Sequence, residues 1–108
     1  MTTEAPQNLE AENVILSSIL ASPEIFDSLS QKIRATDFYN PRNAIIYDAF
    51  AQLANAGLPL DVINLLEQLR QTGNEDRIGG LPAIYALQDT PGSMLSATFA
   101  AEKLKQCT

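Results

Sequence analysis

The sequence predicts an all-α protein, a compact bundle of about six short helices. Apolar residues recur at helical spacing in one segment after another. No segment alternates apolar and polar residues over more than a few positions, as a half-buried strand would. Capping and turn residues separate the apolar segments, and these residues define the elements in order.

The first two helices are expected in the N-terminal third of the chain. Residues 1–8 are expected to form a flexible tail, and the acids Glu10 and Glu12 then suit the first turn of a helix, where the helix dipole favours negative charge. Ala21-Ser22-Pro23 ends this helix. Ser22 is expected to cap a second helix whose first residue is Pro23.

Two capped amphipathic helices follow in the middle of the chain. Asn40 is a favourable cap for a helix that starts at Pro41, because the missing N–H of proline costs nothing in a first turn. Gly57 is expected to end this helix in the left-handed conformation that other residues avoid. Asp61 is then expected to cap the next helix, which ends at Gly73.

The C-terminal third predicts a polar turn over residues 74–77, a short fifth helix over 81–87 and a last helix over about 94–106. We therefore divide the chain into the tail, a globular helical domain over residues 9–91, and a last helix within 92–108. The last helix follows a Pro-Gly break and has a thin apolar face. It either packs on the bundle or projects and meets another chain.

Composition excludes several classes of function. The chain has no His, the commonest general base and metal ligand, and its single cysteine, Cys107, cannot build a zinc site or an internal disulfide. No phosphate-binding loop follows Gly79-Gly80. A net charge of −6 disfavours a role as the main grip on nucleic acid. We therefore predict no catalytic, cofactor or metal site within these residues.

The start of the sequence does not have the pattern of a signal peptide, and no membrane span is expected. The polar start lacks the basic-then-apolar pattern of a signal peptide, and no apolar run approaches the roughly 20 residues that span a membrane. Together with the near absence of cysteine, these features lead us to expect a cytoplasmic protein.

Five short motifs, in order and at matching distances, resemble one protein family. The motifs are Pro6-Gln7-Asn8-Leu9-Glu10-Ala11-Glu12, Asp37-Phe38-Tyr39, Leu60-Asp61-Val62-Ile63, Ile78-Gly79-Gly80-Leu81 and Thr90-Pro91. Nearly the whole chain resembles the N-terminal domain of the bacterial replicative DNA helicase of the DnaB type.

The resemblance implies a non-catalytic domain of a larger enzyme. In that family the parent protein is a hexameric ring that unwinds DNA, and ATP and Mg bind to a separate C-terminal domain with a P-loop. The N-terminal domain and a following helical hairpin form a collar, pair with neighbouring subunits and dock the primase. Because the chain ends near the first hairpin helix, we expect a fragment that is a monomer or weak dimer and meets DNA only through the full ring.

The resemblance and the apolar pattern suggest partner contacts on two segments and in the last helix. The candidate contact residues are Glu10, Leu81, Ala83, Tyr85 and Phe99. Ile84 and Leu87 are interpreted as core residues instead, and Tyr39 and Tyr85 are singled out because each lies near a helix end with a hydroxyl to satisfy. The family pattern is not matched at four places: near Pro82, at Arg42-Asn43, at Asn64 and at Phe99-Ala100-Ala101.

Two other readings remain open. The chain is alternatively a free-standing all-α adaptor or regulator, which would require a gene that stops near Thr108. A small acidic hydrolase would need carboxylates that converge in a pocket, and the sequence offers none at suitable spacing. The gene sequence downstream of Thr108 separates the helicase domain from the adaptor.

Overall fold

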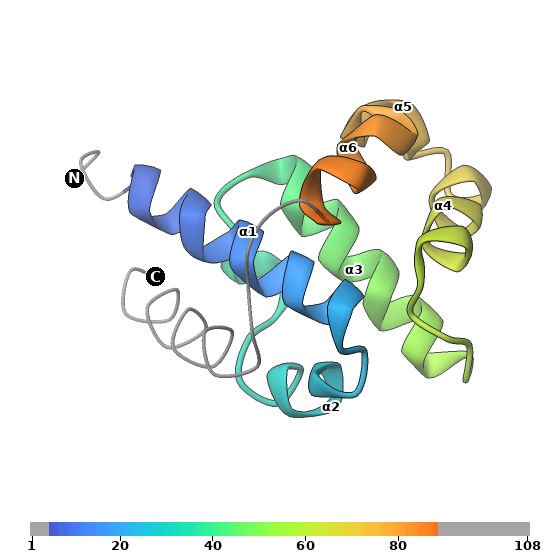
Figure 1. Cartoon of the computed structure of the whole chain (residues 1–108), viewed down its shortest axis with the longest axis horizontal. Coiled ribbons are helices and arrows are strands. Elements are labelled where there is room, and N and C mark those ends of the chain that lie inside the picture. The colour runs from blue at the N-terminus through green and yellow to red at the C-terminus, as the bar shows by residue number, and fades with distance from the viewer. Residues whose placement is uncertain (1–4, 89–108) are drawn as a thin grey trace.

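The computed structural model describes residues 5–88, with side chains from residue 11 onward, and within this range the regular structure is entirely helical (Figure 1). The elements are α1 (Ala5–Ala21), α2 (Ile25–Leu29), the 3-10 helix η2 (Ala35–Asp37), α3 (Pro41–Asn55), α4 (Val62–Gln71), α5 (Glu75–Ile78) and α6 (Gly80–Gln88). The predicted all-α class is confirmed. None of the described helices is long and apolar enough to cross a membrane.

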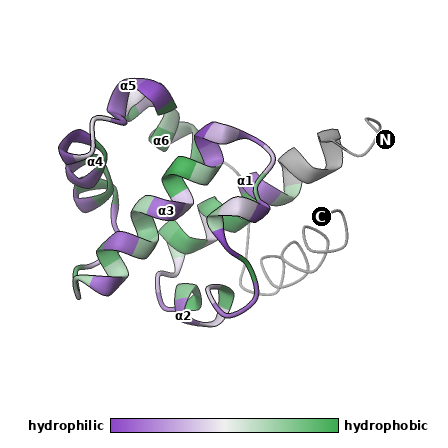
Figure 2. Ribbon diagram, turned by 180° about the vertical axis from the view of Figure 1, so that it is seen from behind, coloured by the Kyte–Doolittle hydropathy of each residue, from purple (hydrophilic) through white to green (hydrophobic). Residues whose placement is uncertain are grey.

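Two long helices, α1 and α3, cross at the centre of the bundle (Figure 1). Helix α2 packs on α1, whereas α4 and α5 pack on α3. Helix α6 closes the bundle because it contacts α1, α4 and α5. Apolar residues of these helices turn toward one another, and polar residues lie along the outer faces, most clearly on α4 (Figure 2).

Helix α3 begins and ends where its boundary residues predict. The Oδ1 atom of Asn40 accepts a hydrogen bond from the backbone N–H of Arg42 at 2.9 Å. At the other end Gly57 has a φ of 75°, and the N–H of Leu58 donates to the carbonyl of Leu53 at 3.0 Å. This pattern is the Schellman motif, in which a left-handed residue satisfies the last carbonyls of a helix.

Helix α4 also has the expected ends. The Oδ1 atom of Asp61 accepts from the N–H of Asn64 at 2.8 Å, and Gly73 follows the helix with a φ of 76°. The side-chain amide of Gln68 donates to the side chain of Gln52, which ties α4 to α3.

The first two helices start at other places than predicted. Helix α1 begins at Ala5, so Glu10 and Glu12 lie beyond its first turn and the predicted dipole role of these acids is wrong. Helix α2 begins at Ile25, and Ser22 does not cap it. The Ser22 carbonyl instead accepts from the N–H of Ile25 at 3.0 Å in the turn that precedes the helix.

A polar turn was predicted over residues 74–77, but the structure has the short helix α5 over residues 75–78. Its one apolar residue, Ile78, is completely buried, and Glu75 forms an ion pair with Arg70 of α4 at 3.2 Å. Burial of Ile78 gives this short segment a tertiary reason to be helical, because a helix of four residues has little stability of its own.

The core is aliphatic, with one aromatic cluster. Its completely or almost completely buried residues are Ile15, Leu16, Ile19, Ile33, Ile46, Phe50, Leu53, Leu65, Leu69, Ile78 and Ile84. Tyr47 packs between Phe26 and Phe38, at centroid distances of 5.3 and 4.9 Å, and its hydroxyl donates to the Ile33 carbonyl at 3.0 Å. Burial raises the pKa of Tyr47 well above its usual value, and the charge of Asp37 raises it further.

The expected breaker at residues 90–93, the last helix with Phe99, and Cys107 all lie outside the described residues.

Candidate functional site

Helix α6 holds three of the candidate contact residues, and two glycines set its position. Gly79 and Gly80 have φ values of 95° and 73°, which favour glycine, so the chain reverses sharply between α5 and α6. A Cβ atom on Gly79 would lie 3.4 Å from the Cβ of Ala83, so the two segments also pack closely. The turn therefore directs α6 back across α1 and α4.

The two faces of α6 have different environments. Ile84 and Leu87 are buried, which confirms that they are core residues. Leu81 and Ala83 are half-buried at the edge of the helix. Tyr85 is 52% exposed, so a large aromatic side chain on this helix is open to solvent.

A surface pocket of about 190 Å³ lies beside α6. Its lining residues come from three helices: Asn13 from α1; Arg42, Asn43 and Ile46 from α3; Ala83, Ala86 and Leu87 from α6. The pocket is smaller than the roughly 300–1,000 Å³ of typical small-molecule sites. It has the size of a partner's side chain, with amides and a guanidinium at its rim.

A completely buried carboxylate, that of Glu12, joins α1 to the start of α3 beside this pocket. The backbone N–H of Tyr39 donates to its Oε2 atom. Its Oε1 atom accepts from the N–H of Asn40 at 3.3 Å and from Nδ2 of Asn43 at 2.8 Å. Three donors thus compensate a charge that burial alone would destabilise strongly.

The Glu12 contacts show which functional residues the sequence did not reveal. Its partners lie 27 to 31 residues away, so no local pattern signals the interaction. Asn43, which is 2% exposed, both binds Glu12 and lines the pocket. Glu12 and Tyr39 each belong to a motif of the family resemblance, and those two motifs were the available signal at this place.

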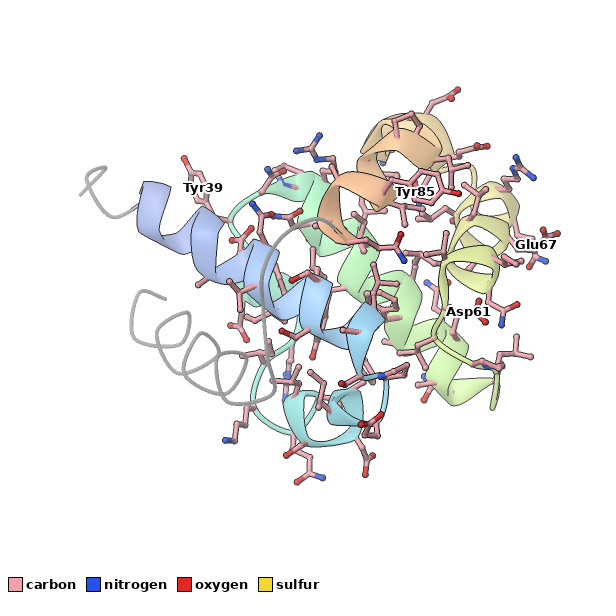
Figure 3. All side chains as sticks on the ribbon, in the orientation of Figure 1. Tyr39, Asp61, Glu67 and Tyr85 are labelled. Atoms are coloured by element: carbon pink, nitrogen blue, oxygen red, sulfur yellow. The ribbon has the colours of Figure 1, made fainter. Side chains whose placement is uncertain are left out.

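The structure places three candidate contact residues on α6 but does not bring all of them to the pocket. Ala83 lines the pocket together with Asn13 of α1, whereas Tyr85, two residues later, lies on about the opposite side of the helix and does not line it. Glu10 lies on α1, one turn before Asn13, but its side chain is not among those described, and Phe99 is outside the described range. Tyr39 is 66% exposed and lies well away from Tyr85 (Figure 3).

The acidic side chains of the described residues are not grouped for metal binding. No three His, Cys, Asp or Glu side chains gather as a potential metal site in the described part of the chain. The buried carboxylate of Glu12 faces backbone and amide donors of its own protein, so its oxygen atoms join α1 to the start of α3.

Comparison with known proteins agrees with the resemblance found in the sequence. The family model of the "DnaB-like helicase N terminal domain" matches residues 4–106. The replicative DNA helicase DnaB of Pasteurella multocida is 35% identical over 97 residues, which cover 89% of this chain and 21% of the relative. The replicative DNA helicase DnaB of Mycobacterium leprae is 32% identical over 98 residues, which cover 91% of this chain and 16% of that relative. The chain thus spans about a fifth of the length of these relatives.

Solved structures extend the agreement to three dimensions. The N-terminal domain of DnaB helicase from Mycobacterium tuberculosis superposes with a TM-score of 0.85 at 30% identity, covering 91% of this chain and 68% of that one. The corresponding domain from Helicobacter pylori, described with its interactions with primase, shares the fold at a TM-score of 0.71 and 12% identity, with coverages of 99% and 86%. The chain belongs to the family of DnaB-like helicase N-terminal domains.

Proposed function

We propose that this chain is a protein-docking domain that recruits primase to a replicative helicase and contributes to the assembly of its hexameric ring. The single observation that supports this function most directly is the solvent exposure of Tyr85, a large aromatic side chain on α6. Exposed aromatic residues are frequent anchors of protein interfaces.

The proposed contacts lie on two sides of α6: Leu81 and Tyr85, four residues apart, share one side, and Ala83 lines the pocket on the other side. Across the pocket lies α1, where Glu10 precedes Asn13. The apolar side chains of this docking surface offer burial to a partner helix, and the polar rim of the pocket offers hydrogen bonds. Glu12 keeps α1 and α3 in register, so both sides of the pocket are preformed before a partner binds.

In this proposal the remaining activities belong to the parent helicase. ATP and Mg bind to its ATPase domain, DNA is held by the full ring, and the complex acts in the bacterial cytoplasm. The isolated chain is then a monomer or weak dimer, and a tight hexamer in light scattering would contradict this expectation.

The test is a heteronuclear NMR titration of the isotope-labelled chain with the C-terminal domain of the primase from the same organism. We expect saturable shifts at the amides of α6 and the first half of α1. Tyr85→Ala should weaken binding, whereas Tyr39→Ala, which alters an even more exposed tyrosine elsewhere, should not. Shifts confined to α2 or α4, or no shifts at saturating primase, would refute this docking surface.

A further inference from the structure

The corner between α3 and α4 exposes two large aliphatic side chains. Ile63 in the first turn of α4 is 77% exposed, and Leu58 in the connecting loop is 46% exposed. Leu58 follows the left-handed Gly57, so the tight end of α3 fixes its backbone. One exposed aliphatic residue is ordinary on a protein surface, so the pair gains meaning only from its surroundings.

The stretch of sequence that forms this corner carries acidic side chains and no basic ones. Between Arg42 and Arg70 the sequence contains no Lys or Arg, whereas it contains Asp48, Asp61 and Glu67. All three acids are exposed. The C-terminal end of α3 adds the partial negative charge of its last carbonyl groups.

The acids lie close to the aliphatic pair along the chain. Asp61 is two residues before Ile63, and Glu67 is four residues after it, so Glu67 and Ile63 share one face of α4. Figure 3 shows Glu67 on the outer side of α4 and Asp61 at the end where the helix begins. The first base after this stretch, Arg70, forms an ion pair with Glu75 of α5.

We propose that the corner formed by Leu58, Asp61, Ile63 and Glu67 is a second docking surface, for a protein segment with an apolar side chain flanked by Lys or Arg. Ile63 and Leu58 would bury against the apolar side chain of the partner, and the two carboxylates would pair with its cations. Complementary charge of this kind increases association rates and selects among partners.

A second copy of the chain is a poor occupant of the same surface. In a two-fold dimer the same patch meets itself, so Asp61 and Glu67 would face acids. Like charges across an interface are unfavourable, and the four corner residues include no base to offset them, while Arg70 further along α4 is paired with Glu75. The occupant must therefore supply the positive charge.

This proposal is independent of primase docking at α6. The corner uses α3, the connecting loop and α4, and it shares no residue with the docking surface around Tyr85. Failure of either proposal leaves the other unaffected, because different variants test them.

The test uses a synthetic amphipathic helical peptide of Leu and Lys, titrated into the isotope-labelled chain and followed by NMR. Two control peptides keep the length: one replaces Lys with Glu, and the other replaces Leu with Ser. We expect saturable shifts centred on Leu58, Ile63 and Glu67 with the Leu–Lys peptide alone. The variant Ile63→Ser leaves the charge of the chain unchanged but removes a central apolar contact. It should weaken binding of the Leu–Lys peptide about tenfold.

Matched variants keep the proposal falsifiable. Glu67→Gln should weaken binding and reduce its salt dependence, whereas Tyr39→Ser, which also truncates an exposed apolar side chain, should leave affinity within twofold. Equal affinity of Ile63→Ser and the unchanged chain would overturn the proposal. Equal affinity for the Ser–Lys and Leu–Lys peptides would also overturn the proposal. Chemical shifts at the corner that change with protein concentration in the absence of peptide would overturn it as well, because they would assign the corner to self-association.

Discussion

Replacement of Glu12 by alanine is expected to destabilise the domain severely. The carboxylate is completely buried and accepts hydrogen bonds from Tyr39, Asn40 and Asn43. Glu12→Ala leaves three donors without this acceptor and removes packing volume from the core. Hydrogen bonds to a charged group contribute about 1.5–3 kcal/mol each, and an unsatisfied buried donor costs about 1–3 kcal/mol.

These terms are not additive, because the three donors share two oxygen atoms and can partly relax together. We therefore expect a loss of about 4 kcal/mol in the free energy of unfolding, a large part of the roughly 5–15 kcal/mol of a whole domain. The corresponding drop in Tm is about 15–30 °C. Glu12→Gln should lose about 2 kcal/mol, because one oxygen remains while the new amide faces a donor.

Urea and thermal unfolding followed by circular dichroism measure both variants, with Glu67→Ala as the exposed control. The control should stay within about 0.5 kcal/mol of the unchanged protein, because Glu67 is solvent-exposed. A loss below about 1 kcal/mol for Glu12→Ala would refute the claim that this carboxylate holds α1 and α3 together. A double-mutant cycle with Asn43→Ala should then give a coupling of about 1–3 kcal/mol.

Three further changes follow from local geometry. Burial raises the pKa of Tyr47, so the folded state keeps the phenol proton that the unfolded chain loses near pH 10. The stability that the protonated Tyr47 contributes is therefore fully present below about pH 10. Above that pH the free energy of unfolding falls by up to about 1.4 kcal/mol per pH unit. Urea unfolding from pH 7 to 11 should show this decline, and Tyr47→Phe should flatten it; an unchanged slope would contradict the assignment. Asp61→Ala removes the cap of α4 and should lower the free energy of unfolding by about 1 kcal/mol in the same assay. Gly57→Ala meets no atom within 4 Å, so its expected cost of about 1–2 kcal/mol is conformational alone, and a neutral result would refute the left-handed end of α3.

Helix boundaries that depend on local chemistry were predictable from the sequence. Four boundary residues begin or end helices at the predicted positions, because each acts on backbone groups within a few residues of itself. They are Asn40, Gly57, Asp61 and Gly73. The starts of α1 and α2 were wrong because the capping signals there are weak. Helix α5 was missed because its stability depends on burial of Ile78, which is a tertiary effect.

The candidate site was only partly predictable for the same reason. Helical spacing separated the core residues Ile84 and Leu87 from the exposed Tyr85 on one short helix. The Glu12 contacts join residues 27 to 31 positions apart, and the pocket joins α1 and α3 to the still more distant α6. No periodicity of the sequence predicts such contacts.

The central claim is that the exposed face of α6 binds primase, and calorimetric titration of two tyrosine variants tests it most directly. Tyr85→Ala and Tyr39→Ala each remove one exposed ring, at two separate places on the same fold. We predict that Tyr85→Ala weakens binding to the C-terminal domain of primase about tenfold or more, while Tyr39→Ala stays within twofold. Equal affinities for the two variants would contradict docking at α6.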